Sequence, residues 1–257
     1  MLTNPIRNTL RDTAHSQNVT CNKLMRITKI TEFGSKSYFY PSNTEVFTIE
    51  WSNGTNPKFY AFGEDRTVRQ VDKDYFALNT IGSNYRKIEE QLPAKVESYR
   101  TTKDNLGNIY FCFYQESIIH GFGKEGNKFL EWDAGELGQG HAIYDIKYQT
   151  NGFIWLAFPS GQTVTQASLE NKQETFRIGD YSWEEKYEPL SYPESISLNN
   201  NYLYIPNMGH NKLFKVNLES YEYEHVSTFE ERLWQYEETN LGTFVITDTG
   251  LFEVEDD

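Results

Sequence analysis

Four residues recur at comparable places along the chain and together could bind a small molecule. Tyr99, Tyr144 and Trp234 each stand a few residues before a short turn, and Glu194 takes the same place in its own segment. Flat aromatic faces with a few polar groups suit sugars, and aromatic rings beside a carboxylate suit organic cations. His141, which follows a glycine, adds a side chain that can act as acid, base or ligand. We therefore predict a ligand site at these five residues.

Each of these residues also has a structural interpretation. The aromatic side chains can pack between neighbouring sheets, and a register error of one residue would turn each of them to the other face. His141 can be an exposed loop histidine. These alternatives stay open on the sequence alone.

Acid–base hydrolysis is the alternative chemistry. Glu45, Glu97 and Glu194 stand near predicted strand starts, and a glycosidase needs two carboxylates about 5 to 9.5 Å apart. The sequence contains no Gly-x-Ser-x-Gly motif, no phosphate-binding glycine loop and no HxxxH or CxxC spacing. A serine-nucleophile motif is therefore absent, and a dedicated zinc site is not expected.

Short strands must position these residues, and residues 140–179 show the unit that does so. Segments 143–148, 153–159, 163–169 and 173–178 are apolar or alternating, with turn residues at each gap. Related four-strand segments precede and follow this unit. The pattern predicts a β-propeller, in which the first strands line a central channel and their starts face its mouth.

The repeat length supports this architecture. Second strands can be aligned on Lys58, Ile109, Ile154, Leu203 and Phe244, at spacings between 41 and 51 residues, and propeller blades repeat at about 40 to 50 residues. The turns before these strands are rich in Gly and Asn, which tolerate positive φ. Alternatives are a β-sandwich or two small β domains.

Five blades fit the chain. In the first blade we expect strands at 45–51, 58–63, 66–71 and 75–81, followed by a polar connector at 83–95. The last unit offers only three strands, so residues 24–30 are expected to supply its fourth strand beside 251–255. This closure removes open sheet edges. Residues 1–23 are predicted to be a polar arm, and residues 24–257 a single propeller domain; a sixth blade would have to come from residues 1–51.

One segment resembles a known repeat. Residues 193–218 read PESISLNNNYLYIPNMGHNKLFKVNL. The matching residues are Pro193-Glu194-Ser195, Leu203-Tyr204-Ile205 and Gly209-His210-Asn211-Lys212-Leu213. This pattern is similar to the repeat of NHL-type propellers and of gluconolactonase-type, calcium-dependent propeller hydrolases. The resemblance implies the propeller fold and places Glu194 where those hydrolases have a metal-ligating Asp. The resemblance therefore suggests calcium as a cofactor. At the corresponding position, however, the other blades have Tyr99, Tyr144 and Trp234 instead of carboxylate or amide ligands.

Composition limits the partners. The chain of 257 residues has a net charge of -13, so nucleic acid and anionic membrane surfaces are not expected partners. Its two cysteines, Cys21 and Cys112, do not make a disulfide framework. No signal-like or membrane-spanning segment is visible, which predicts a cytoplasmic protein.

We therefore expect an all-β, five-bladed propeller that is a non-enzymatic binding protein. The ligand or partner would be a small molecule, a glycan or a protein held at the channel mouth, without a cofactor. The alternative is a propeller hydrolase, either metal-dependent and lactonase-like or a glycosidase that uses carboxylates at the channel mouth.

Overall fold

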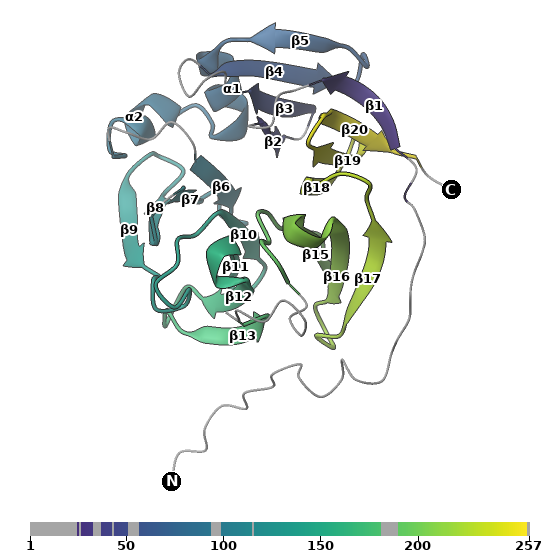
Figure 1. Cartoon of the computed structure of the whole chain (residues 1–257). Coiled ribbons are helices and arrows are strands. Elements are labelled where there is room, and N and C mark those ends of the chain that lie inside the picture. Colours follow the sequence, from purple (N-terminus) through teal and green to yellow (C-terminus); the bar gives the residue numbers. More distant parts are fainter. Residues whose placement is uncertain are drawn as a thin grey trace, which may run out of the picture.

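The described residues form five four-stranded antiparallel sheets around one axis, which is a five-bladed β-propeller (Figure 1). The structure is a computed structural model that describes residues 25–255 except 26, 33–36, 43, 51–56, 94–98, 115 and 181–189. The predicted arm at 1–23 lies outside the described residues. No helix among the described residues is long and apolar enough to span a membrane.

Each sheet is one blade, and its strands run from the axis outward. Blade 1 contains β2 (Ser37–Pro41), β3 (Glu45–Glu50), β4 (Lys58–Gly63) and β5 (Val68–Val71). Blade 2 contains β6 (Tyr99–Lys103), β7 (Ile109–Phe113), β8 (Ile118–Phe122) and β9 (Lys128–Asp133). Blade 3 contains β10 (Asp145–Gln149), β11 (Phe153–Phe158), β12 (Thr163–Ser168) and β13 (Glu174–Ile178). Blade 4 contains β14 (Ser197–Leu198), β15 (Tyr202–Asn207), β16 (Lys212–Asn217) and β17 (Tyr223–Thr228). Blade 5 contains β18 (Leu233–Thr239), β19 (Gly242–Thr247), β20 (Gly250–Val254) and, as its outer strand, β1 (Ile27–Glu32).

The two ends of the described chain close the ring, as predicted. Strand β1 pairs antiparallel with β20, from Ile27 opposite Val254 to Glu32 opposite Gly250. A second link joins the innermost strands of blades 5 and 1. The Gln235 amide accepts from the Phe39 N–H at 2.9 Å and donates to its carbonyl oxygen at 3.0 Å. This buried side chain therefore replaces a stretch of strand pairing at the centre of the ring.

The structure corrects the predicted outer strand at 75–81, which lies in a helix. Helix α1 spans Lys73–Thr80, and the Asp72 side chain caps it by accepting from the Tyr75 N–H at 2.7 Å. Its buried residues Phe76, Ala77 and Thr80 share one helical face. A second helix, α2 (Tyr85–Glu89), lies in the predicted connector. Both helices fill the space between blades 1 and 2 (Figure 1).

The strands predicted for blade 1 were also each placed one position too close to the axis. Its innermost strand is β2, which the sequence interpretation missed, so residues 45–50 form the second strand and Lys58 begins the third. The other four alignment positions do lie in second strands: Ile109, Ile154, Leu203 and Phe244. The innermost strand of blade 3, predicted from residue 143, begins at Asp145.

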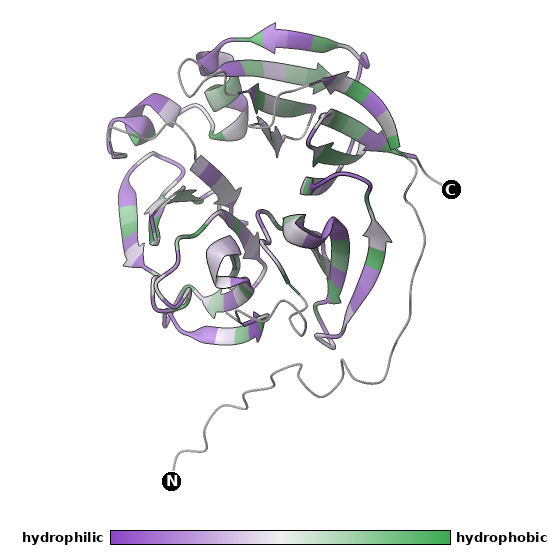
Figure 2. Ribbon diagram, in the orientation of Figure 1, coloured by the Kyte–Doolittle hydropathy of each residue, from purple (hydrophilic) through white to green (hydrophobic). Residues whose placement is uncertain are grey.

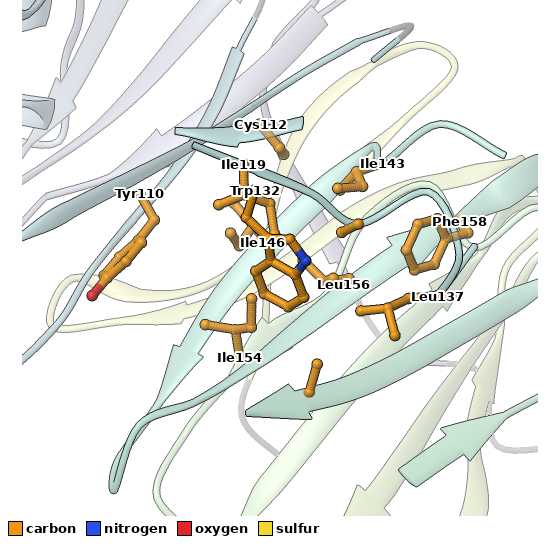
Figure 3. Packing of buried hydrophobic residues seen from close by; sticks show 12 residues of the cluster. Tyr110, Cys112, Ile119, Trp132, Leu137, Ile143, Ile146, Ile154, Leu156 and Phe158 are labelled. Atoms are coloured by element: carbon orange, nitrogen blue, oxygen red, sulfur yellow. The ribbon is translucent and has the colours of Figure 1, made fainter. Parts of the chain in front are cut away.

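The core lies between the blades. Alternating hydrophobic and polar residues run along the strands (Figure 2). The largest cluster joins blades 2 and 3, where Trp132 lies among Ile146, Ile154 and Leu156 (Figure 3). Cys112 is a buried free thiol in the same cluster. Such interblade packing holds the innermost strands, and therefore the channel, in place.

Three of the turns before the second strands have the positive φ that their residues tolerate. Gly107, Asn151, Gly152 and Gly242 have φ values from 70° at Asn151 to 136° at Gly242. These turns end the innermost strands of blades 2, 3 and 5. In blade 4, Asn200 and Asn201 occupy the turn without positive φ.

Candidate functional site

The starts of the innermost strands form a small aromatic pocket, here called the mouth pocket. It is lined by Tyr38, Tyr40, Tyr99, Arg100, Tyr114, Tyr144 and Glu194. Tyr38 and Tyr99 stand at the beginnings of β2 and β6, and Tyr144 directly precedes β10. The free volume is about 10 Å³, which is room for a group the size of one water molecule.

Three of the five predicted site residues line this pocket: Tyr99, Tyr144 and Glu194. His141 is not among the lining residues; its ring lies against Gly161, beyond the end of β11. Trp234 is not among them either, because its indole N–H donates to Asp248 at 2.9 Å and its ring packs against the cluster between blades 5 and 1. Trp234 therefore packs between blades, which was the alternative interpretation of the aromatic residues.

Four lining residues were not identified from the sequence. Tyr38 and Tyr40 belong to the missed strand β2, and Tyr114 follows the end of β7. Arg100 adjoins the predicted Tyr99. The alternating run at 37–41, which ends in a proline, was the available signal for β2.

Among the described residues, Glu194 is the only carboxylate in the lining of the mouth pocket. Among the described residues its carboxylate has no hydrogen-bond or ion-pair partner. Burial raises the pKa of Glu194 to about 7, and the positive charge of Arg100 opposes this rise without cancelling it. The carboxyl group therefore changes its charge close to neutral pH.

The tyrosine rings surround this carboxyl group at close range. The Tyr114 and Tyr144 rings lie 4.2 Å apart, and Tyr40 contacts Tyr99 at 6.4 Å between ring centroids. The Tyr40 hydroxyl donates to the backbone carbonyl of Tyr99 and so ties β2 to β6. Burial raises the pKa of Tyr114 and Tyr144, so both hydroxyls are neutral at ordinary pH. The pocket thus presents neutral rings and one titratable acid.

Arg100 forms the inner wall of the pocket. It is 8% exposed, and its guanidinium lies over the rings of Tyr38 and Tyr40 at 4.5 and 5.2 Å. Arg100 and Tyr40 also line a second, larger cavity of about 480 Å³, here called the channel cavity. This cavity lies toward the far ends of the innermost strands, where Ser42, Lys103 and Lys147 line it.

The polar lining of the channel cavity comes from four blades. Blade 1 contributes hydroxyl groups, and the charged and amide residues are Asn79 of α1, Arg100, Lys103, Asp145, Lys147, Gln235 and Glu237. Lys147 bonds both Glu237 oxygens at 3.1 and 3.2 Å across the channel. The Asp145 carboxylate accepts the backbone N–H groups of Ile146 and Ile196, each at 2.9 Å. These acids are therefore held by the protein itself.

The carboxylates expected for a hydrolase do not meet in the described structure. Glu45 is bound by Arg69 and by the Tyr75 hydroxyl in blade 1, and Glu97 lies outside the described residues. Within the described ranges, no group of three or more His, Cys, Asp or Glu residues could hold a metal ion. Of the two members of the trio that the structure describes, Glu194 lines the mouth pocket and Glu45 does not.

Comparisons with known proteins find similarity at the level of structure only. No protein-family model matches the chain, and no curated protein matches it. Virginiamycin B lyase from Staphylococcus aureus has 14% identity and a TM-score of 0.48, over 87% of this chain and 67% of that one. Glutaminyl cyclase from Myxococcus xanthus has 9% identity and a TM-score of 0.47, over 91% of this chain and 100% of that one. A nidogen/laminin complex has 8% identity and a TM-score of 0.48, over 82% of this chain and 84% of that one.

These likenesses are too distant to assign an activity. The five sheets and their closure define this chain as a β-propeller.

Proposed function

We propose that this propeller is a non-enzymatic binding protein that holds the ammonium group of a small molecule or of a protein partner in its mouth pocket. The observation that carries the proposal is Glu194, a carboxyl group without a partner that is enclosed by tyrosine rings. Aromatic rings with a desolvated carboxylate attract ammonium groups electrostatically. The resemblance to NHL-type repeats and the cytoplasmic setting remain predictions that agree with this function.

Size decides between the ligand classes that the sequence left open. A free volume of about 10 Å³ accepts an ammonium head but not a sugar ring. An amine is therefore favoured over a glycan, unless the pocket opens. The overall charge of -13 also attracts a cationic ligand.

Charge balance at the pocket supports the same ligand. Arg100 already supplies one positive charge, yet burial outweighs it and the pKa of Glu194 stays raised to about 7. A second cation beside Glu194 would compensate its desolvated charge. Binding of an ammonium group would therefore lower the pKa of Glu194 and favour its ionised form.

Titration calorimetry with n-butylamine at pH 8 tests the proposal. The wild-type protein should bind the amine, Glu194→Gln should weaken it at least about tenfold because the ion pair is lost, and n-butanol should not bind. Glu170→Gln, at an exposed turn of blade 3, is the matched control and should bind as the wild type does. Equal amine binding by Glu194→Gln and the wild type would contradict the proposal.

The proposal includes no cofactor, which a thermal melt can check. Calcium at millimolar concentration should leave the melting temperature unchanged relative to a chelator, since a ligand of the folded state would raise it. A clear rise that is lost in Glu194→Gln would favour the lactonase-like alternative instead.

A further inference from the structure

Arg100 is a buried charge that the protein leaves unpaired. Its guanidinium makes no hydrogen bond and no ion pair within 4 Å to any described residue, and its Nη1 is completely buried without a partner. Buried arginines are ordinarily paired, because desolvation of a charge is costly. The two tyrosine rings that flank it provide a cation–π contact but no acceptor for its N–H groups.

The acids of the cavity do not form hydrogen bonds with Arg100. Asp145 attracts its positive charge through space, but the two Asp145 oxygens accept the backbone N–H groups of Ile146 and Ile196. Glu237 is held by Lys147. Arg100 lines the cavity, so its guanidinium donors other than the fully buried Nη1 are available to a molecule there.

The cavity suits a small ligand in size and in sign of charge. Its volume of about 480 Å³ falls within the usual range for small-molecule sites, about 300 to 1,000 Å³. The lining has three cations, Arg100, Lys103 and Lys147, against two acids, Asp145 and Glu237. This local excess of positive charge occurs in a chain whose net charge is -13.

We propose that the channel cavity is a second binding site, which takes a small molecule through a carboxylate or phosphoryl group placed on Arg100. The planar guanidinium presents parallel N–H groups that match two oxygens of such an anion. The anion supplies the directly bonded partner that Arg100 lacks among the described residues. Lys103, at the outer end of β6, attracts the same anion toward the cavity.

This site goes beyond the mouth pocket and needs a ligand of the opposite charge. Glu194 does not line the channel cavity. An anion in the cavity and an amine at the mouth can therefore be measured separately. Failure of either site leaves the other proposal standing.

Titration of the full chain with inorganic phosphate and with malonate, by calorimetry and by thermal shift, tests the site and distinguishes its two anion classes. The wild type should bind one of them saturably at millimolar concentration and melt at a higher temperature in its presence. The tighter of the two identifies the ligand as a phosphoryl compound or a carboxylate. Absence of saturable binding by both would overturn the proposal.

Variants assign the anion to Arg100. Arg100→Gln should weaken binding about tenfold or more, whereas the exposed Arg86→Gln should bind as the wild type does. If Arg100→Gln does not fold, Arg100→Lys provides the test: it keeps the charge but loses the paired donors, and should weaken binding several-fold. Unchanged affinity in the folded Arg100 variants would overturn the assignment.

Discussion

The two ends of the channel differ in chemistry although one residue pair, Tyr40 and Arg100, lines both. The mouth pocket is narrow and aromatic, and it contains the carboxyl group of Glu194, which has no bonded partner among the described residues. The channel cavity is wide and polar, and its acids are held by protein partners. The Arg100 guanidinium lies between the two ends and has no bonded partner among the described residues.

This difference shows that the net charge of a chain does not determine the sign of the charge at its individual binding sites. The chain has a net charge of -13, but the channel cavity has more cations than acids in its lining. In a buried site, the partner of each charge decides which ligand it can accept. Variants that change one side chain at a time test this difference between the two ends.

The largest effect is expected from breaking the Lys147–Glu237 pair in the channel cavity. Lys147→Met leaves the Glu237 carboxyl group, which is 7% exposed, without its counter-charge. The free energy of unfolding should fall by about 3–5 kcal/mol at pH 7. Urea denaturation at fixed protein concentration measures this loss.

The double variant Lys147→Met/Glu237→Leu is its control. It removes both charges and should recover most of the lost stability. Burial raises the pKa of Glu237, so the penalty in the single variant should also shrink at acidic pH. A loss below about 1 kcal/mol in the single variant would show that the pair is not a main stabiliser of this end.

At the mouth pocket, removal of the unpaired carboxylate should have the opposite effect and raise the free energy of unfolding. Burial raises the pKa of Glu194 from 4.5 to about 7, so the folded state holds this proton more tightly than the unfolded state. Its contribution to stability is fully present below pH 4.5 and is lost as the pH rises through about 7. Glu194→Gln should therefore gain about 1–2 kcal/mol at pH 8, allowing for partial exposure, and nothing at pH 4.

Thermal melts of both proteins across this pH range measure the effect. The difference between the curves should open between pH 4.5 and about 7. Amine binding by the wild type should strengthen over the same range, because the ionised carboxylate attracts the ammonium group. A pH-independent difference in stability would show that Glu194 is not desolvated in the folded protein.

A smaller effect is expected from one ring of the mouth pocket. Tyr144→Leu removes the aromatic face that lies 4.2 Å from Tyr114, and a single cation–π contact contributes about 0.5–1 kcal/mol. Butylamine affinity should fall about two- to fivefold, while phosphate or malonate affinity stays unchanged. Weakening of both ligands together would mean that the two ends are not separate sites.

The smallest effect is expected at the outer rim of the channel cavity. Lys103 is exposed, so its attraction for an anion is screened by solvent and salt. Lys103→Gln should weaken anion binding about twofold and reduce its dependence on ionic strength. A loss of affinity as large as that of Arg100→Gln would show that the anion binds mainly at the rim and not at the buried guanidinium.

Most of the blades could be predicted from the sequence because their strands alternate and their turns carry Gly or Asn. Residues 75–81 were misinterpreted because an apolar run followed by a short turn fits a strand as well as a helix. The capping residue Asp72 and the helical spacing of Phe76 and Thr80 were the signals against a strand. Interblade packing, which no local pattern shows, selected the helix.

The site was predictable only in part, for a related reason. Tyr99, Tyr144 and Glu194 follow from counting back from the turns, because first strands start at the same end of a propeller. Tyr38 was missed with its short strand. The importance of Arg100 could not be inferred, since a local sequence does not tell which buried charges lack partners in the folded ring.

Ring closure by β1 and β20 has a consequence for the order of folding. The strand at Ile27–Glu32 finds its hydrogen-bonding neighbour only in Gly250–Val254, so on the ribosome it must wait until almost all of the described chain has been made. Blades 2 to 4 pair local strands and can form earlier. A circular permutant that joins β1 directly behind β20 would convert this distant pairing into a hairpin and should close its last blade sooner.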